Sequence, residues 1–252
     1  MKIILLIQAR MGSTRLPGKV MKLVNGKPMI SLLLERVSNV KNISKVIVTT
    51  SEQPENDILV DYVKEVGGDF FRGSENDVLD RFYRAAKVFK GDMIVRITAD
   101  CPLLDPQLID DIIDFALKNK KDYCSNVIPP TFPDGQDVEV FTFASLEKCW
   151  KEATLKSDRE HVTTYIRKNA SHNNKDLFSS INYTYTKNIS HIRMTVDEPD
   201  DLDCISNLVR VLGRDAQWTL YTDYIINHQD EFKNQSIKRG VGYLKSLQQD
   251  LK

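Results

Sequence analysis

The sequence lacks the cysteine and histidine patterns of disulfide-stabilised and zinc-dependent folds. Its four cysteines, Cys101, Cys124, Cys149 and Cys204, lie far apart with no C-x-x-C pair, and its four histidines show no H-E-x-x-H spacing. This argues against a zinc site and against a disulfide framework. Cys101 adjoins a candidate metal-binding aspartate, but no histidine lies nearby in sequence to activate its thiol. We therefore expect a buried, unreactive cysteine there.

Net charge and long apolar runs are also missing. The 35 Lys and Arg residues balance the 35 Asp and Glu residues, which argues against broad attraction to nucleic acid or to a membrane surface. No apolar run approaches the roughly 20 residues that span a bilayer, and the first seven residues lack a signal-peptide pattern. We expect a cytoplasmic protein without nucleic-acid or membrane partners. The 252 residues, undivided by any repeat or Gly/Ser linker, are expected to form a single domain.

What the sequence does have is concentrated in its first twenty residues, MKIILLIQARMGSTRLPGKV. Lys2 to Ile7 predicts a strand buried on both faces, and the polar loop after it combines tight-turn glycines, hydroxyl groups and cations: Gly12, Gly18, Ser13, Thr14, Arg10, Arg15 and Lys19. Glycine lets backbone N–H groups approach an anion, while arginine and lysine contact phosphate oxygens. The spacing fits neither a Walker A loop nor G-x-G-x-x-G. We predict a phosphate-binding loop, and the alternative is a solvated basic loop.

The next hundred residues alternate between helical and strand patterns. Helices are predicted at 27–40 and 55–66, a third begins at residue 78, and a fourth runs from a cap at Asp105 to residue 118. Strands are predicted at 46–50, 69–71 and 92–97. Such alternation indicates an α/β fold with a mostly parallel sheet, which binds ligands at the carboxyl ends of its strands. Thr49, Thr50 and Ser51 end one strand, where they either line a nucleotide pocket or cap the next helix.

Aspartates follow two predicted strands. Asp100 lies in the polar segment that follows the strand at 92–97, where a carboxylate would reach Mg²⁺ bound to nucleotide phosphates; otherwise it is an N-cap or a turn former. Asp197 follows a strand predicted at 191–196 and precedes Pro199, which suits the first turn of a helix. Asp200 and Asp201 are expected only to complement the positive end of that helix.

From residue 123 to about 190 the alternation becomes irregular. Pro129, Pro130 and Pro133 interrupt regular structure, an alternating strand is predicted at 135–140, and helices are predicted at 143–153 and 160–168, the second capped by Ser157 or Asp158. We expect a small irregular lobe over the carboxyl edge of the sheet that recognises a second substrate. The candidates are more polar than packing requires, although each is as readily a structural residue: Asn126, Gln136, Asp137, Glu139, Arg159 and His161.

Six segments together resemble one family. They are IQARMGSTRLPGKV, RGSENDVLDRFYRAA, VRITADCPLLDP, PDGQDVEVF, DREHVTTYIR and IRMTVDEPDDL, and in this order they resemble the SpsF-type cytidylyltransferases, relatives of the CMP-Kdo and CMP-sialic acid synthetases. The resemblance covers nearly the whole chain. It implies a Rossmann-like, mixed but mostly parallel sheet of the nucleotide-diphospho-sugar transferase type. The tail IKRGVGYLKSL is similar to the family's tail, with Gly240-Val241-Gly242 in place of a more usual Asn-Glu-Gly.

The resemblance also implies site residues. Asp100 and Asp197 would hold Mg²⁺ and, with Lys19 and Arg10, carry catalysis. Arg72 would donate to the cytosine base, and Ser74 would face its amine, although Ser74 and Asp77 also have the spacing of a helix cap. The implied nucleotide-binding residues are Gln8, Ala9, Arg10, Gly12, Ser13, Arg15, Lys19, Thr50, Arg72, Ser74 and Asp77.

The implied reaction is transfer of CMP from CTP to an acceptor, with release of pyrophosphate. The family's relatives load 2-keto-3-deoxy sugar acids, so the expected acceptor is an acidic sugar whose carboxylate pairs with Arg159, His161 or Arg193. A homodimer is expected through the irregular lobe, where Tyr123, Ile128 and Phe132 look exposed. Three alternatives stay open at this point: transfer to a phosphorylated small molecule, a metal-dependent glycosyltransferase using Asp137-Val138-Glu139, and a non-catalytic nucleotide-binding protein.

Overall fold

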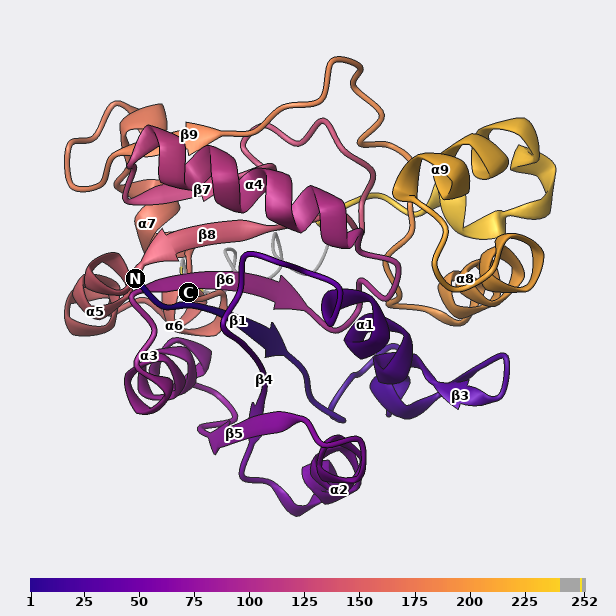
Figure 1. Cartoon of the computed structure of the whole chain (residues 1–252), viewed down its shortest axis with the longest axis horizontal. Coiled ribbons are helices and arrows are strands. Elements are labelled where there is room, and N and C mark those ends of the chain that lie inside the picture. Colours follow the sequence, from indigo (N-terminus) through magenta and orange to yellow (C-terminus); the bar gives the residue numbers. More distant parts are fainter. Residues whose placement is uncertain (241–249, 251–252) are drawn as a thin grey trace.

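A computed structural model describes residues 1–240 and 250, and within residues 1–240 it forms a seven-stranded sheet (Figure 1). The strand order is β5-β4-β1-β6-β8-β7-β9, and every pairing is parallel except those of β8 with β6 and with β7. The expected α/β fold with a mixed, mostly parallel sheet is confirmed. The strands are β1 Ile3–Gln8, β4 Lys45–Ser51, β5 Asp69–Gly73, β6 Met93–Thr98, β7 Tyr123–Ser125, β8 Glu139–Thr142 and β9 Ser180–Asn182, with a separate hairpin of β2 Leu23–Val24 and β3 Lys27–Pro28.

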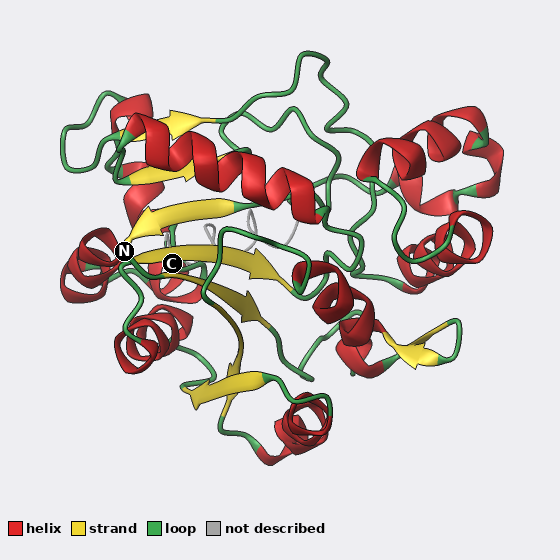
Figure 2. Cartoon of the chain, viewed as in Figure 1, coloured by secondary structure: helices red, strands yellow, loops and turns green. Residues whose placement is uncertain are grey.

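Helices cover both faces of the sheet (Figure 2). One face packs against α1 Met29–Val37, α2 Asp57–Glu65, α4 Pro106–Asn119, α8 Pro199–Leu212 and α9 Trp218–Asn227, and the other against α3 Val78–Phe89, α5 Phe143–Glu152, α6 Lys156–Glu160 and α7 Thr164–Lys168. Short 3₁₀ turns are η1 Lys19–Met21, η2 Pro54–Asn56, η3 Ser171–Asn173, η4 Gln229–Glu231 and η5 Lys233–Ser236. None of the helices described is long and apolar enough to cross a membrane.

Strand β1 is apolar along its length because both of its faces are buried. Leu5 and Ile7 pack into the core on the α1 and α4 side, whereas Ile4 and Leu6 pack into the core on the α3 side. The chain runs from β1 outward to β4 and β5, then returns to β6 on the other side of β1. The carboxyl ends of β1 and β6 therefore lie side by side at a switch point, with Gln8 opposite Thr98.

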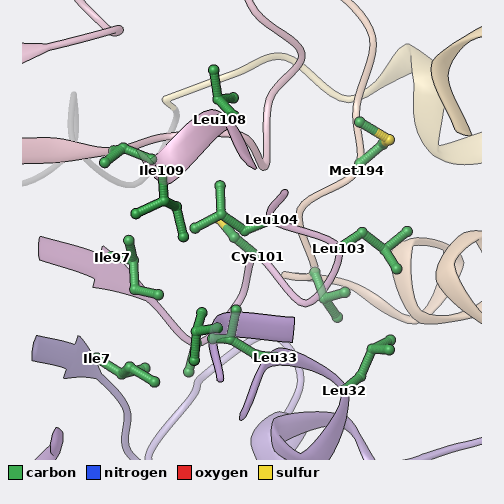
Figure 3. Close-up of a cluster of buried hydrophobic side chains, with 14 of the residues drawn as sticks. Ile7, Leu32, Leu33, Ile97, Cys101, Leu103, Leu104, Leu108, Ile109 and Met194 are labelled. Carbon is green, nitrogen blue, oxygen red and sulfur yellow. The ribbon is translucent and has the colours of Figure 1, made fainter. Parts of the chain in front are cut away.

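The core beneath this switch point is close-packed. Ile97 of β6, Leu33 of α1 and Ile109 of α4 belong to one buried cluster, and Cys101 lies among them (Figure 3). Burial raises the pKa of the Cys101 thiol well above its usual value, with a further contribution from the charge of Asp100. A protonated, covered thiol is a poor nucleophile, which agrees with the expected unreactive role.

Two predicted elements of the lobe differ from the structure. The strand expected at 135–140 begins only at Glu139, because Gly135 to Val138 form a loop held by side-chain hydrogen bonds of Asn126 and Gln136. The helix expected at 160–168 is two helices, α6 and α7, separated by Val162 at φ 60°. Ser157 and Asp158 lie inside α6, so the prediction that they cap a helix at 160–168 was wrong.

The segment 191–196 is not a strand of the sheet. Its backbone bonds to two loops, since Met194 donates to the Asp134 carbonyl at 2.7 Å and Val196 donates to the Asp100 carbonyl at 2.7 Å. These contacts place Asp197 beside Asp100. After α8 the chain forms α9, and between His228 and Gly240 its regular structure is limited to the short 3₁₀ turns η4 and η5. The tail resemblance spans 237–247, and its residues 241–247 lie outside the described residues.

The lobe buries the side chains expected to be exposed. Tyr123 is fully buried and Phe132 nearly so, while Ile128 is half-buried. The Tyr123 hydroxyl bonds to Glu139, and Phe132 packs on Tyr183 and Trp218. These aromatic residues are therefore core, and the exposed surface from which a dimer was expected does not exist at Tyr123 and Phe132.

Candidate active site

The loop after β1 folds back on itself and presents its cations to one cavity. Gly18 at φ 67° donates its N–H to the Met11 carbonyl at 3.0 Å, and the Ser13 hydroxyl accepts from the Leu16 N–H at 3.3 Å. The left-handed conformation at Gly18 lets the chain turn sharply into η1, which begins with Lys19. On the other side, the Asn56 amide oxygen accepts from the Met11 N–H at 2.8 Å and anchors the loop to the η2 turn.

This loop cavity has a volume of about 260 Å³. It is lined by Gln8, Ala9, Arg10, Gly12, Ser13, Thr14, Arg15, Lys19, Val20, Thr98, Ala99, Asp100 and Asp197. Seven of the eleven predicted nucleotide-binding residues are in this list, and so are both predicted metal ligands. The structure therefore brings together, at the switch point of the sheet, groups that the sequence spreads over almost 200 positions.

Lys19 lies between the two aspartates. Its Nζ is 3.4 Å from Asp100 Oδ2 and 2.9 Å from Asp197 Oδ1, and it donates to the Val196 carbonyl at 2.7 Å. Burial acts to lower the pKa of Lys19, but the charges of Asp100 and Asp197 outweigh it and raise that pKa above its usual value. Burial acts to raise the pKa of Asp197, and the charges of Lys19, Arg15 and Arg193 lower it. These opposite shifts keep the Lys19 ammonium and the Asp197 carboxylate charged at neutral pH.

The two arginines of the loop also have acidic partners. Arg15 Nη2 is 3.0 Å from Asp197 Oδ2, and its Nη1 is 3.4 Å from Glu198 Oε1. Arg10 Nη1 is 2.6 Å from Glu75 Oε1 in the loop before α3. Both arginines also line the loop cavity, and a guanidinium fork suits carboxylate and phosphate oxygens alike.

The donor set at Asp100 and Asp197 fits a hard divalent cation. Both carboxylates are about one-quarter exposed toward the same cavity, and the Thr98 hydroxyl donates to Asp100. No group of three or more His, Cys, Asp or Glu side chains suited to a metal occurs among the described residues. Two carboxylates alone suit a cation such as Mg²⁺, which takes its remaining ligands from water and from the phosphates of a substrate.

A larger central cavity of about 500 Å³ adjoins the loop cavity and shares Asp100 and Asp197 with it. Of the predicted acceptor residues, Asp137, His161 and Arg193 line it, and Glu139 lines a neighbouring side cavity of about 360 Å³. Burial lowers the pKa of His161, which keeps its imidazole neutral at pH 7. Asp137 is paired with Arg239 Nη2 at 2.5 Å, and Glu139 accepts from Arg96, from the Tyr123 hydroxyl and from the Thr163 hydroxyl.

Three further acceptor candidates do not line these cavities. The Asn126 and Gln136 amides are buried and bond to backbone groups, including the Asp105 N–H at 3.0 Å from Gln136 Oε1. Arg159 binds Asp77 with its Nε and Nη2 and the Trp150 carbonyl with its Nη1. These contacts hold the lobe together and do not present the side chains to a ligand.

The four remaining nucleotide candidates lie around β4, β5 and the start of α3, outside these cavities. Arg72 uses Nε for the Ser51 carbonyl, Nη1 for Asp57 and Nη2 for the Gln53 carbonyl. The Asp77 side chain caps α3 by accepting from the Asp80 N–H, and the Ser74 hydroxyl accepts from the Asp77 N–H. Thr50 is fully buried. The contacts of Arg72, Ser74 and Asp77 are thus made within the protein, and the Thr50 hydroxyl has no hydrogen-bond partner among the described residues.

The structure adds residues that the sequence analysis did not select. Arg96, Thr98, Asp134, Thr195 and Lys238 line the central cavity. Arg96 carried a signal, since it is the one charged side chain in the strand MIVRIT, whose other residues before Thr98 are apolar. Asp201 was expected to serve only the helix terminus, and that was wrong, because its fully buried carboxylate also binds Arg193 at 2.8 Å.

Comparisons with known proteins point to one family. Residues 4–229 match the model of a family described as cytidylyltransferase. The chain is 31% identical to the spore coat polysaccharide biosynthesis protein SpsF of Bacillus subtilis over 84% of this chain and 88% of that protein. It is 34% identical to a 3-deoxy-manno-octulosonate cytidylyltransferase of Trichlorobacter lovleyi over 47% of this chain and 46% of that protein. A solved cytidylyltransferase structure from Leptospira borgpetersenii superimposes with a TM-score of 0.87 at 33% identity, covering 95% of this chain and all of that one.

Proposed function

The chain belongs to the cytidylyltransferase family, and from that premise we propose that it transfers CMP from CTP to a sugar acid of the 2-keto-3-deoxy type and releases pyrophosphate. The observation that carries this proposal is the position of Lys19 between Asp100 and Asp197 at the switch point, beside the cationic loop. The sequence relationship to a 3-deoxy-manno-octulosonate cytidylyltransferase supports the acceptor class. The relationship to a spore coat polysaccharide protein supports a role in making a surface glycan.

In this proposal the loop holds the triphosphate. Arg10, Arg15 and Lys19 meet its negative charge, and the Ser13 hydroxyl and neighbouring backbone N–H groups donate to its oxygens. An acceptor hydroxyl then attacks the α-phosphorus in line with the leaving pyrophosphate. Phosphoryl transfer asks little covalent chemistry of the protein, so its contribution is positioning and neutralisation of charge. Lys19, held rigidly by three partners, is the cation best placed to do this.

Asp100 and Asp197 would hold the divalent cation. A Mg²⁺ bound there would polarise the α-phosphate and lower the pKa of an attacking hydroxyl. The low pKa of Asp197 keeps its carboxylate charged and ready for a cation across the neutral range.

The central cavity supplies the acceptor side. The partly buried His161 and the exposed Lys238 both line this cavity, and we assign these two to the carboxylate of the sugar. Arg193 is a weaker candidate for that role, because its fork already holds Asp201. Asp134 and Asp137, on the same cavity, would accept hydrogen bonds from sugar hydroxyls.

We extend the proposal to the setting of the reaction. The chain would act in the cytoplasm, where CTP is made, as a single domain whose lobe at about 123–190 binds the acceptor and pairs with a second copy. The proposal that two copies pair through this lobe rests on family resemblance alone. A monomer mass in solution that does not change with concentration would refute the dimer.

The rival functions fit the geometry less well. In a glycosyltransferase reading, Asp137-Val138-Glu139 would hold the metal, but Asp137 is paired with Arg239, Val138 is fully buried and Glu139 is held by Arg96. A non-catalytic nucleotide-binding protein would need the cationic loop but not two carboxylates aimed at the same cavity. Transfer to a phosphorylated small molecule uses the same loop and differs only at the central cavity.

The decisive assay is pyrophosphate release from CTP with Mg²⁺ across a panel of keto-deoxy sugar acids and phosphorylated sugar alcohols. We expect release with CTP, little with ATP, GTP or UTP, and dependence on a sugar acid. Release that depends only on a phosphorylated acceptor would move the protein to the alternative substrate class. Absence of any CTP-dependent release with either class of acceptor would contradict the proposal.

Two variants separate an enzyme from a binding protein. Asp100→Asn and Asp197→Asn keep the side-chain shape but remove a charge that the cation needs, so we expect turnover to fall about 10³-fold, equivalent to ~4 kcal/mol of transition-state stabilisation. Affinity for CTP without metal should change much less. Asp200→Asn is the matched control, because Asp200 is exposed in the first turn of α8 and serves only that terminus. Near-normal turnover in the first two variants would exclude this metal site.

A further inference from the structure

Asp201 lies at the third position of α8, where it accepts more hydrogen bonds than a helix terminus requires. Its Oδ2 accepts from the backbone N–H groups of Asp197 at 2.9 Å and Glu198 at 3.0 Å, which completes a capping box. The same carboxylate also binds Arg193, with Nε to Oδ1 and Nη2 to Oδ2 both at 2.8 Å. Asn234 donates to Oδ1 at 3.1 Å. Asp201 is fully buried, so all of these contacts are shielded from solvent.

Arg193 connects this buried carboxylate to the active site. Its side chain is 4% exposed, and after binding Asp201 it donates Nη1 to Asp134 Oδ2 at 3.0 Å and Nη2 to Asp197 Oδ2 at 3.4 Å. The rigid guanidinium plane makes these contacts geometrically dependent on one another. Burial acts to lower the pKa of Arg193, and the hydrogen bond and charge of Asp201 raise it above its usual value, so it is a permanent cation.

Asp197 is consequently held from two directions. Its backbone N–H is fixed by Asp201, and its Oδ2 faces Arg193 and also Arg15. Its other oxygen, Oδ1, faces Lys19 at 2.9 Å in the loop cavity. Without these contacts, a carboxylate on a surface loop would rotate about χ1 and χ2. Most of the resulting rotamers would turn Asp197 Oδ1 away from the cavity.

We propose that Asp201 and Arg193 are positioning residues for nucleotidyl transfer: Asp201 fixes Arg193 and the Asp197 backbone, and Arg193 holds Asp197 Oδ2 so that Oδ1 is presented to Lys19 and to the divalent cation. The inference rests on the proposed function and deepens it. It replaces the two separate roles that the sequence suggested, a helix terminus for Asp201 and an acceptor contact for Arg193.

The test measures cation binding separately from turnover. Arg193→Lys keeps the charge and removes the fork, and Asp201→Asn keeps the shape and removes the charge. Binding of Mn²⁺ would be measured by electron paramagnetic resonance, with the protein alone and with CTP, at a temperature where denaturant titration shows each variant folded. We expect both variants to bind Mn²⁺ 10- to 100-fold more weakly than wild type, the range typical of removing a partner of a metal ligand. Affinity for CTP without metal should stay within about twofold.

Kinetics provide a second readout. Both variants should lose kcat with a small change in KM for the acceptor, and raising Mn²⁺ should restore part of kcat. A purely structural role would lower the denaturation midpoint and leave the Mn²⁺ affinity of the folded protein unchanged. The matched control is Asp200→Asn, which neighbours Asp201 but is exposed.

The outcomes are distinguishable. Wild-type Mn²⁺ affinity in folded Arg193→Lys would overturn the inference while leaving the proposed function intact. A wild type that binds no Mn²⁺, with or without CTP, would also overturn it. A third outcome is that the wild type binds Mn²⁺ and the variants bind it more weakly, but the wild type releases no pyrophosphate from CTP. That result would refute the proposed reaction and retain the role of Asp201 and Arg193 in positioning a cation ligand. If Asp201→Asn does not fold, Arg193→Lys decides the matter.

Discussion

Arg10 and Glu75 form an ion pair between two loops that are far apart in sequence. Arg10 Nη1 is 2.6 Å from Glu75 Oε1, and the two side chains are 44% and 21% exposed. Burial acts to raise the pKa of Glu75, but hydrogen bonds from Ser51 and Arg10 lower it below its usual value. Glu75 is therefore a charged competitor for the guanidinium that, in the proposed function, binds the triphosphate.

Replacing Glu75 by Gln should tighten CTP binding. The neutral amide competes less for Arg10, and an ion pair this exposed is worth about 1 kcal/mol or less, so we expect up to about a fivefold lower Kd. Calorimetric titration without metal at low salt would measure it, with Glu65→Gln at the exposed end of α2 as the control. Weaker binding in Glu75→Gln would show instead that Glu75 orients Arg10 for the phosphate.

At the scale of elements, the site depends on a close crossing of two non-helical segments, the loop at Gly135 and the segment 191–196. Gly135, at φ 112°, packs against the backbone of Met194 and Thr195, and a Cβ at this position would lie 2.7 Å from the Met194 carbonyl carbon. The segment 191–196 continues directly into Asp197. The contact therefore sets where the end of 191–196 meets the carboxyl end of β6.

Gly135→Ala should destabilise the protein strongly. Positive φ costs an alanine about 1 kcal/mol, and the clash with the Met194 backbone adds about 1 to 3 kcal/mol, for a total of about 2 to 4 kcal/mol. Gly26→Ala is the matched control, because Gly26 also has positive φ, at 86°, but has nothing within 4 Å of the added Cβ. Urea unfolding of both variants would measure the difference, and equal losses would mean that the crossing adjusts without cost.

At the scale of the whole molecule, all four cysteines are buried and divided between the two cores. Cys101, Cys124 and Cys204 lie in the core that contains α1 and α4, and Cys149 lies in the core that contains α3. Burial raises the pKa of Cys124 and of Cys204 to about 12 and that of Cys149 above its usual value. The thiols thus report on opening of the folded state, because they react only when exposed and ionised.

Alkylation by iodoacetamide at pH 8 should be slow for all four thiols in the native protein and fast in denaturant. If labelling of Cys149 requires global unfolding, CTP at 100 times its Kd should stabilise the protein by ~2.7 kcal/mol and slow that labelling about 100-fold. Mass spectrometry of the labelled peptides would follow each thiol separately. Rapid native labelling of any one of them would show a local opening that this packing does not predict.

The sequence by itself determined the features that depend on neighbours along the chain. The apolar run of β1, the glycines and cations of the loop after it, and the Asp105 cap of α4 follow from local patterns, and the structure has them where they were predicted. Because the carboxyl ends of parallel strands share one edge, Asp100 could also be assigned to the same edge as the loop. Which strands flank β1 was not predicted from the sequence, and the structure pairs it with β4 and β6.

Only the tertiary structure decided the roles of polar residues whose partners are distant in sequence. Arg72 and Arg159 resembled ligand contacts, yet Asp57 and Asp77 hold them, while Arg193 resembled an acceptor contact and is held by Asp201. Charged side chains carry no local signal of which opposite charge they will meet, because the meeting depends on how loops cross after folding. The crossing of loops also explains why 191–196 is not a strand. It has the composition of a strand, but its backbone hydrogen bonds go to the loops at Asp134 and Asp100.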